Sequence, residues 1–149
     1  ANFPTGSYSS AYSANPGSNL LSVEAYHAFT WHFMRKWETS WRMGYQFNGT
    51  NDAIAVRPGP FFHTTGAISR EVSAKLRLGG LGYFMQQTAD DHIGGVPTPG
   101  TRERAFGAGP GLVYTGPGGL LGILSYPVEF GVENRFRGSR ATLQLILHL

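Results

Sequence analysis

The sequence feature that most constrains this chain is a strict alternation of apolar and polar residues over long segments. The clearest case lies in residues 36–48, where the alternating set is Trp37, Thr39, Trp41, Met43, Tyr45 and Phe47. A period of two residues is that of a β-strand with one apolar face. Strands of soluble sheets are usually about 5–6 residues long, whereas a tilted strand that crosses a membrane needs about 9–11. The length of the segments therefore favours membrane-spanning strands.

The same period recurs along the whole chain. The predicted strands are residues 20–33, 36–48, 64–78, 81–89, 103–115, 120–136 and 141–149. Predicted turns lie at Gly79-Gly80, Gly116–Gly119 and Arg137–Arg140, and residues 90–102 form a long loop. Residues 53–62 are either a loop or a further strand, because Pro58 and Pro60 restrict pairing there.

These segments predict an all-β fold in a single domain over residues 1–149: an antiparallel up-and-down transmembrane β-barrel, or part of one, with about seven or eight strands. A helix is the alternative for residues 69–78, but strict alternation from Glu71 to Leu78 favours a strand. Composition agrees, because charged residues make up 14%, below the roughly 25% of soluble domains. No run of about 20 apolar residues could form a membrane-spanning helix.

Charged side chains on the polar side of the strands are candidates for lining the barrel interior. These lumen-lining candidates are Glu38, Arg42, Glu71, Lys75, Arg77, Glu129, Glu133 and Arg135. They form either a salt-bridge network that fills the interior or a charged constriction that selects what passes. Aromatic residues near strand ends are candidates for interfacial girdles, with a platform for carbohydrate or aromatic ligands as the alternative. The girdle candidates are Trp31, Trp37, Trp41, Tyr45, Tyr83 and Tyr126.

The sequence predicts no catalytic chemistry. It contains no cysteine, which excludes thiolate nucleophiles and cysteine-ligated zinc. His27 and His32 are five residues apart and point to opposite faces of a strand, so no metal site is expected. Asp90-Asp91 could serve acid–base chemistry but more simply ends a strand. The protein is therefore predicted not to be an enzyme and to need no cofactor, and its mild net charge of +3 predicts no nucleic-acid partner.

Several short motifs resemble one known family. They are Pro4–Tyr8, Asn15–Asn19, Tyr45–Asn48 with Asn51-Asp52, Gly79–Tyr83 leading to Gln86–Thr88 and Asp90-Asp91, Gly109-Pro110, Glu129, Asn134-Arg135 and Gly138. Together they resemble the outer-membrane β-barrels of the MetA-pathway phenol-degradation family. The resemblance implies a Gram-negative outer-membrane location and the passage of hydrophobic or aromatic compounds. It also implies that a comparable barrel half precedes these motifs, so that this chain is the C-terminal portion of a larger barrel.

Three functions follow as expectations. The first is a passive, porin-like channel or transporter for small hydrophobic or aromatic compounds in the bacterial outer membrane. The second is a structural barrel with a plugged lumen that associates with other proteins, and the third is a soluble β-sandwich binding module. Bacterial single-chain barrels have even strand numbers, so either residues 53–62 or the N-terminal segment supplies a further strand, or the rest of the barrel comes from a partner besides membrane lipid. The expected partner is the N-terminal barrel half or further copies of the chain.

Overall fold

The computed structural model describes residues 1–12 and 15–147, and it is built of strands with one short 3-10 helix. The long strands are β1 Ser22–Phe33, β2 Trp37–Asn48, β4 Phe61–Ser73, β5 Leu76–Gln87 and β8 Arg104–Thr115. The shorter ones are β3 Val56–Arg57, β6 His92–Ile93, β7 Val96–Pro97, β9 Leu120–Ser125, β10 Val128–Glu133 and β11 Thr142–Leu147. The 3-10 helix η1 spans Pro117–Gly119. Within the described residues no helix is both long enough and apolar enough to cross a membrane.

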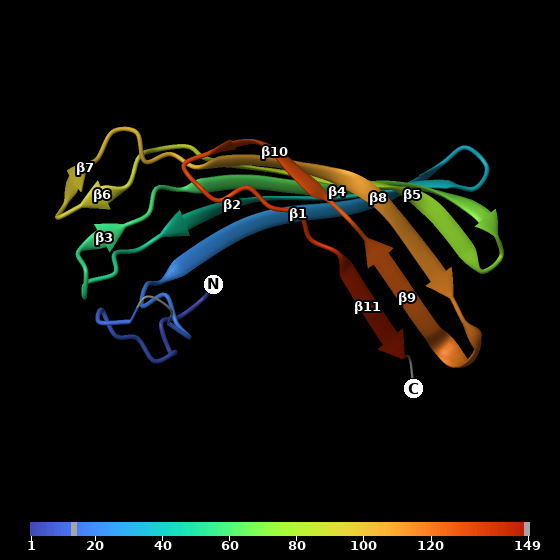
Figure 1. The fold of residues 1–149 in the computed structure, drawn as a ribbon, viewed down its shortest axis with the longest axis horizontal. Coiled ribbons are helices and arrows are strands. Elements are labelled where there is room, and N and C mark those ends of the chain that lie inside the picture. Colours follow the sequence, from blue (N-terminus) through green and yellow to red (C-terminus); the bar gives the residue numbers. More distant parts are fainter. Residues whose placement is uncertain (13–14, 148–149) are drawn as a thin grey trace.

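One antiparallel sheet contains most of the chain. Its strand order is β1-β2-β4-β5-β8-β9-β11, and β10 pairs with β8 beside β9. From β1 to β9 the strands of this sheet follow the order of the chain, whereas β10 pairs with β8 and β11 with β9. The sheet curls into an arch (Figure 1). The prediction of an all-β, antiparallel, up-and-down fold that forms part of a barrel is confirmed.

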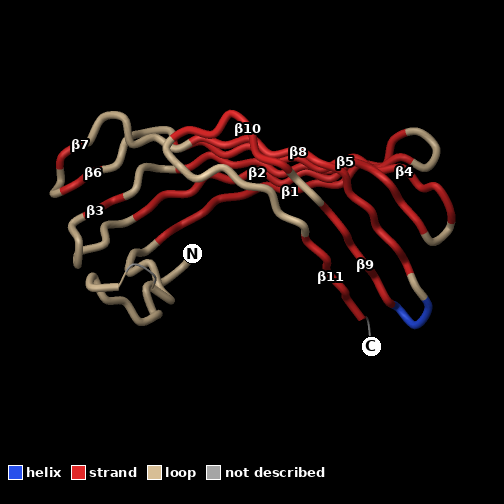
Figure 2. The backbone as a smooth tube through the Cα atoms, viewed as in Figure 1, coloured by secondary structure: helices blue, strands red, loops and turns tan. Residues whose placement is uncertain are grey.

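The two ends of the sheet differ in their connections. Short turns join β1 to β2, β4 to β5 and β8 to β9 at one end. Long segments of residues 49–60, 88–103 and 134–141 lie at the other end, where β3, β6 and β7 form a small separate sheet (Figure 2). Residues 53–62, for which the sequence allowed either a loop or a further strand, contain β3 and the start of β4.

The predicted turn at Gly79-Gly80 is wrong. The chain turns at Ala74 and Lys75, and both glycines pair inside β5, Gly79 with Ser69 and Gly80 with Ile68. A side chain at Gly79 would overlap the carbonyl oxygen of Ile68. This glycine therefore serves a close approach of two strands rather than a turn.

The predicted strand 120–136 is two strands. Pro127 has no N–H to donate and separates β9 from β10, although both pair with β8. Gly131 has φ +57°, and the register of β10 with β8 shifts between Phe130 and Glu133. The last predicted strand, 141–149, corresponds to β11, and its final residues 148–149 lie outside the described residues.

The pairing register separates two faces of the sheet. One continuous row pairs Ala28, Arg42, Thr65, Tyr83, Gly107 and Glu129. The next row pairs Phe29, Trp41, Gly66, Gly82, Ala108 and Val128. Because directly paired residues share a face, we call the side with Arg42 and Glu129 the polar face and the side with Trp41 and Val128 the apolar face.

The sheet is a single layer. Among the described residues Ala105 is the one buried hydrophobic side chain, while large hydrophobic residues such as Leu143, Leu145 and Trp31 are exposed. A soluble protein normally hides such a face against a second layer. The energetics of this fold therefore depend on what covers the apolar face.

Candidate functional site

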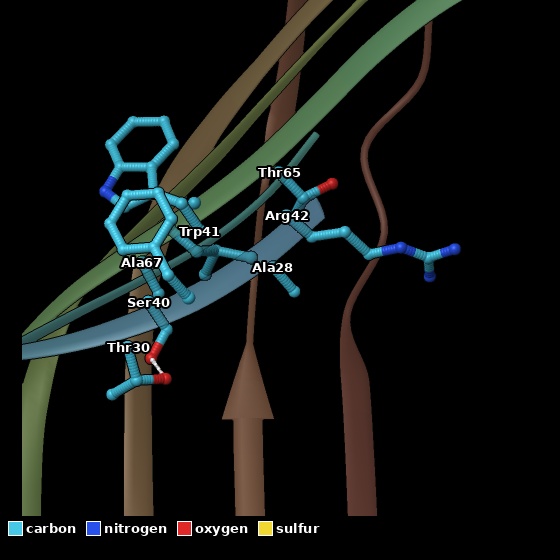
Figure 3. A pocket seen from close by; sticks show the side chains of 10 residues that line it. Ala28, Thr30, Ser40, Trp41, Arg42, Thr65 and Ala67 are labelled. Atoms are coloured by element: carbon cyan, nitrogen blue, oxygen red, sulfur yellow. Dashed lines mark hydrogen bonds between the residues drawn. The ribbon is translucent and has the colours of Figure 1, made fainter. Parts of the chain in front are cut away.

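The middle of the polar face is lined by small side chains. The register pairs Thr30 with Ser40, Ser40 with Ala67, and Ala67 with Leu81. A hollow of about 630 Å³ lies over this row (Figure 3). The hydroxyl oxygens of Thr30 and Ser40 are 2.9 Å apart and satisfy each other. The hollow therefore combines small side chains with the aromatic rings of Phe29 and Trp41 and the charged side chain of Arg42, which also line it.

A second hollow of about 520 Å³ continues from the first along β5, β8 and β9. Both hollows are lined by Thr65, Ala67 and Leu81. Val113 and Ile123, which pair directly in the register, add apolar surface to the second one. The polar face thus has an apolar middle that could hold the body of a small organic compound.

Charged groups lie at the turn end of these hollows. The Arg77 guanidinium lies 3.3 Å from the Glu38 carboxylate, although their strands, β5 and β2, are separated by β4. Lys36 and Glu71 form a further pair at 3.7 Å. Strands two apart are about 9.6 Å from each other, so contacts between their side chains indicate that the polar face is the concave one.

A second charged group lies at the loop end. The Glu24 carboxylate is 3.0 Å from Arg42 and 3.2 Å from Nε2 of His63. Gly44 lies between Glu24 and His63, and a Cβ atom there would come within 2.8 Å of both side chains. Glycine on the middle strand thus leaves space for two polar side chains to meet above it.

Tyr83, Gly107 and Glu129 repeat this arrangement on β5, β8 and β10. They pair in one row, and the Tyr83 hydroxyl donates to Oε1 of Glu129 at 2.6 Å across Gly107. The Glu129 side chain also accepts the Gly138 N–H at 2.8 Å and lies 3.6 Å from Arg135. Glu129 is only 9% exposed, and the two hydrogen bonds together with the positive charge of Arg135 compensate its buried charge.

The predicted lumen-lining residues are distributed as follows. Glu38, Arg42, Glu71, Arg77 and Glu129 share the polar face and take part in the pairs described above. Lys75 lies in the turn between β4 and β5, and Arg135 follows β10 and reaches back to Glu129.

Glu133 is placed differently from the other predicted lumen-lining residues. It pairs with Arg104, both in the register and as an ion pair. The alternation on β8 puts Arg104 on the same side as Phe106, on the apolar face. The register shift after Phe130 accounts for this change of side.

Two residues that form ion pairs on the strands of the polar face, Glu24 and His63, were not among the predicted site residues. Glu24 lies on the polar side of the alternation in residues 20–33, so the sequence signal was present. His63 precedes the predicted strand 64–78, whereas β4 begins at Phe61. A boundary error of three residues was enough to leave this histidine out.

Aromatic side chains form two levels on the apolar face. Near the turn between β1 and β2, Phe33 lies 5.1 Å from Trp31 and 6.3 Å from Trp37, between ring centroids. Toward the loop end, four phenylalanines form a row across β4, β5, β8 and β10, with successive ring centroids 6.2, 4.6 and 5.7 Å apart. They are Phe62, Phe84, Phe106 and Phe130.

The predicted girdle residues divide between these levels and other places. Trp31 and Trp37 belong to the turn-end level, and Tyr45 pairs with Phe62 at the loop-end level. Trp41 lies midway along β2 with its ring over Gly66. Tyr83 is on the polar face, and Tyr126 lies between β9 and β10, where its hydroxyl donates to Ser139.

The acidic pair at the loop end supports the rim. Oδ1 of Asp91 accepts the Gly59 N–H at 2.9 Å and the side-chain amide of buried Gln87 at 2.5 Å, which ties residues 49–60 to residues 88–103. Asp90 pairs with Arg102 at 3.1 Å. In the part of the chain that the structure describes, no group of three or more histidine, aspartate or glutamate side chains is arranged to hold a metal ion.

Comparison with known proteins places most of the chain in one family. A family model described as "Putative MetA-pathway of phenol degradation" matches residues 1–145. Neither the search of curated proteins nor the search of solved structures found a match.

Proposed function

Because this chain belongs to the family described as "Putative MetA-pathway of phenol degradation", we propose that it forms part of an outer-membrane β-barrel through which small hydrophobic or aromatic compounds pass. The apolar face contacts lipid and the polar face lines the passage. The family description supports aromatic compounds as the substrate class. No residue is assigned a catalytic role.

The observation that carries the membrane proposal is the pair of aromatic levels on the apolar face. Trp37 and Tyr45 mark the two levels on β2, and a rise of about 3.3 Å per residue puts them about 26 Å apart along the strand. With the strand tilt of about 35–45° that is typical of such barrels, this is about 19–22 Å across the membrane. Outer-membrane barrels have an apolar band about 25 Å tall between aromatic girdles. Short turns at one end and long loops at the other also fit that class of protein.

A structural barrel with a plugged lumen is the second candidate. The ion pair of Glu38 with Arg77 and the folding of Gly138 onto Glu129 place side chains and main chain over the polar face. Single-channel conductance in planar bilayers separates the two. Discrete openings support a passage, whereas a silent protein that is inserted and folded supports the plugged barrel.

The two faces can be tested with single cysteines, because the sequence contains none. Ser40→Cys lies on the polar face and Thr39→Cys on the apolar face of the same strand, so each variant controls for the other. We expect a charged, water-soluble maleimide to label Ser40→Cys, and lipid-borne bromine to quench a fluorophore attached at Thr39→Cys. The reverse pattern would contradict the assignment of the faces.

The open edges of the sheet predict a partner. In the described residues the outer edge of β1 is paired only at Ser22, by Asn2, and β11 is paired only with β9. An unsatisfied backbone group in hydrocarbon costs several kcal/mol, so membrane insertion requires further strands along both edges. We propose that an N-terminal barrel half or further copies of this chain supply them.

Crosslinking in native membranes followed by mass measurement tests this partner. We expect adducts that contain the 16.2 kDa chain together with a second polypeptide or with further copies of itself, and their mass identifies which. Folded, inserted protein that remains at the monomer mass would refute the proposal.

A further inference from the structure

The segment between β10 and β11 carries three arginines within six residues, Arg135, Arg137 and Arg140. Its main chain is held beside β10, because Glu129 donates its N–H to the Gly138 carbonyl at 3.0 Å and Arg140 donates its N–H to Pro127 at 3.2 Å. The positions of these arginines on the sheet are therefore set by backbone pairing.

The nearby carboxylate does not neutralise all three arginines. Glu129 binds the Tyr83 hydroxyl, the Gly138 N–H and Arg135. Arg137 donates from Nε to the Glu129 main-chain carbonyl at 2.8 Å, and this bond leaves its charge uncompensated. Within the described part of the chain, no carboxylate lies within 4.0 Å of the Arg137 or Arg140 side chain. The segment therefore keeps excess positive charge.

Two hollows meet at Arg140. One, of about 300 Å³, is lined by Tyr83, Met85, Pro127, Glu129, Arg135, Gly138, Ser139 and Arg140. The Glu129 carboxylate in this lining already accepts hydrogen bonds from the Tyr83 hydroxyl and the Gly138 N–H. Arg140 also lines the hollow of about 520 Å³ that contains Leu81, Val113 and Ile123. A guanidinium group thus borders an apolar surface large enough to hold a small organic molecule.

We propose that this end of the polar face binds small organic acids. Arg140 holds the anionic group, with Arg135 beside it, and the apolar body of the acid lies on Leu81, Val113 and Ile123. Guanidinium and carboxylate groups form charge-assisted hydrogen bonds that are stronger than neutral ones. The inference rests on the proposed passage of aromatic compounds and narrows the favoured class to their anionic forms.

The test compares two probes that differ in charge. Para-fluorobenzoate and para-fluorobenzyl alcohol are titrated by fluorine NMR into the full folded chain in detergent micelles, with empty micelles as the blank. We expect the benzoate to bind at least about tenfold more tightly, because a hydrogen bond to a charged group contributes that much or more. Arg140→Gln should remove this preference and leave the affinity for the alcohol unchanged.

Arg102→Gln is the matched control, since Arg102 is an exposed arginine paired with Asp90 on a rim loop. It should keep the wild-type preference, and circular dichroism should show unchanged strand content in both variants. Equal affinity for the two probes, no binding of either, or an equal loss in Arg102→Gln would overturn the inference. Conductance without a preference for benzoate would contradict the organic-acid site but not the proposed channel. Binding of benzoate without conductance would contradict the channel but not the organic-acid site.

Discussion

Replacing Leu145 with arginine is expected to lower the free energy of unfolding in a bilayer by about 2–4 kcal/mol, the cost of a cation on the lipid side near the membrane midplane. Leu145 lies on the apolar face, pairs with Gly122, and is 67% exposed. In the folded barrel that exposed surface would contact acyl chains. Equilibrium unfolding in urea from lipid vesicles measures the effect.

Gln144→Arg provides the control on the same strand. Gln144 pairs with Ile123 on the polar face, where water is available, so the same charge should cost much less. If both variants lowered the free energy of unfolding by a similar amount, this would contradict the assignment of one face to lipid and the other to water.

Replacing Gly79 with alanine is expected to cost about 3 kcal/mol, the upper part of the range for a side chain forced into a site without space. The added Cβ would overlap the Ile68 carbonyl, which is main chain and cannot rotate away. Relief would require β4 and β5 to separate along their pairing.

Gly80→Ala is the control for this experiment. Its Cβ would meet only the Gly109 carbonyl, at an ordinary 3.6 Å, so we expect a change within about 0.5 kcal/mol. Chemical denaturation of both variants measures the difference. Equal stabilities would show that the strands around Gly79 adjust at little cost.

Alternation was sufficient to predict most strands, but it could not locate every turn. Residues 37–48 alternate cleanly and residues 22–33 do so except around His27, and β1 and β2 lie within two residues of the prediction at each end. Gly79-Gly80 looks like a turn in sequence, whereas Ala74 and Lys75, which form the real turn, carry no turn signal. Gly79 leaves no space for a side chain because the Ile68 carbonyl on β4 lies beside it. A contact between two strands of this kind cannot be predicted from a single sequence.

The sequence predicted which face of the sheet carries the charged residues of the candidate site, but not which of these side chains pair with one another. Parity correctly grouped Glu38, Arg77 and Glu129 on one side of the sheet. Which side chains meet depends on which strands are separated by one other strand and on glycines in that middle strand. The alternation of apolar and polar residues predicts neither. Tyr83 was predicted as an interfacial aromatic because of its residue type, whereas the register places it opposite Gly107, within reach of Glu129.

Since each strand of the large sheet pairs with strands that lie close to it along the chain, the sheet can form without long loop closures. Low contact order of this kind favours fast folding among proteins dominated by strand pairing. Formation of the arch should therefore be a first-order process, independent of protein concentration. If the strands that cover the edges of β1 and β11 come from another chain, their addition is a bimolecular step, and its rate falls when the protein is diluted. The slowest stage of biogenesis would then be an encounter between chains rather than a conformational search within one.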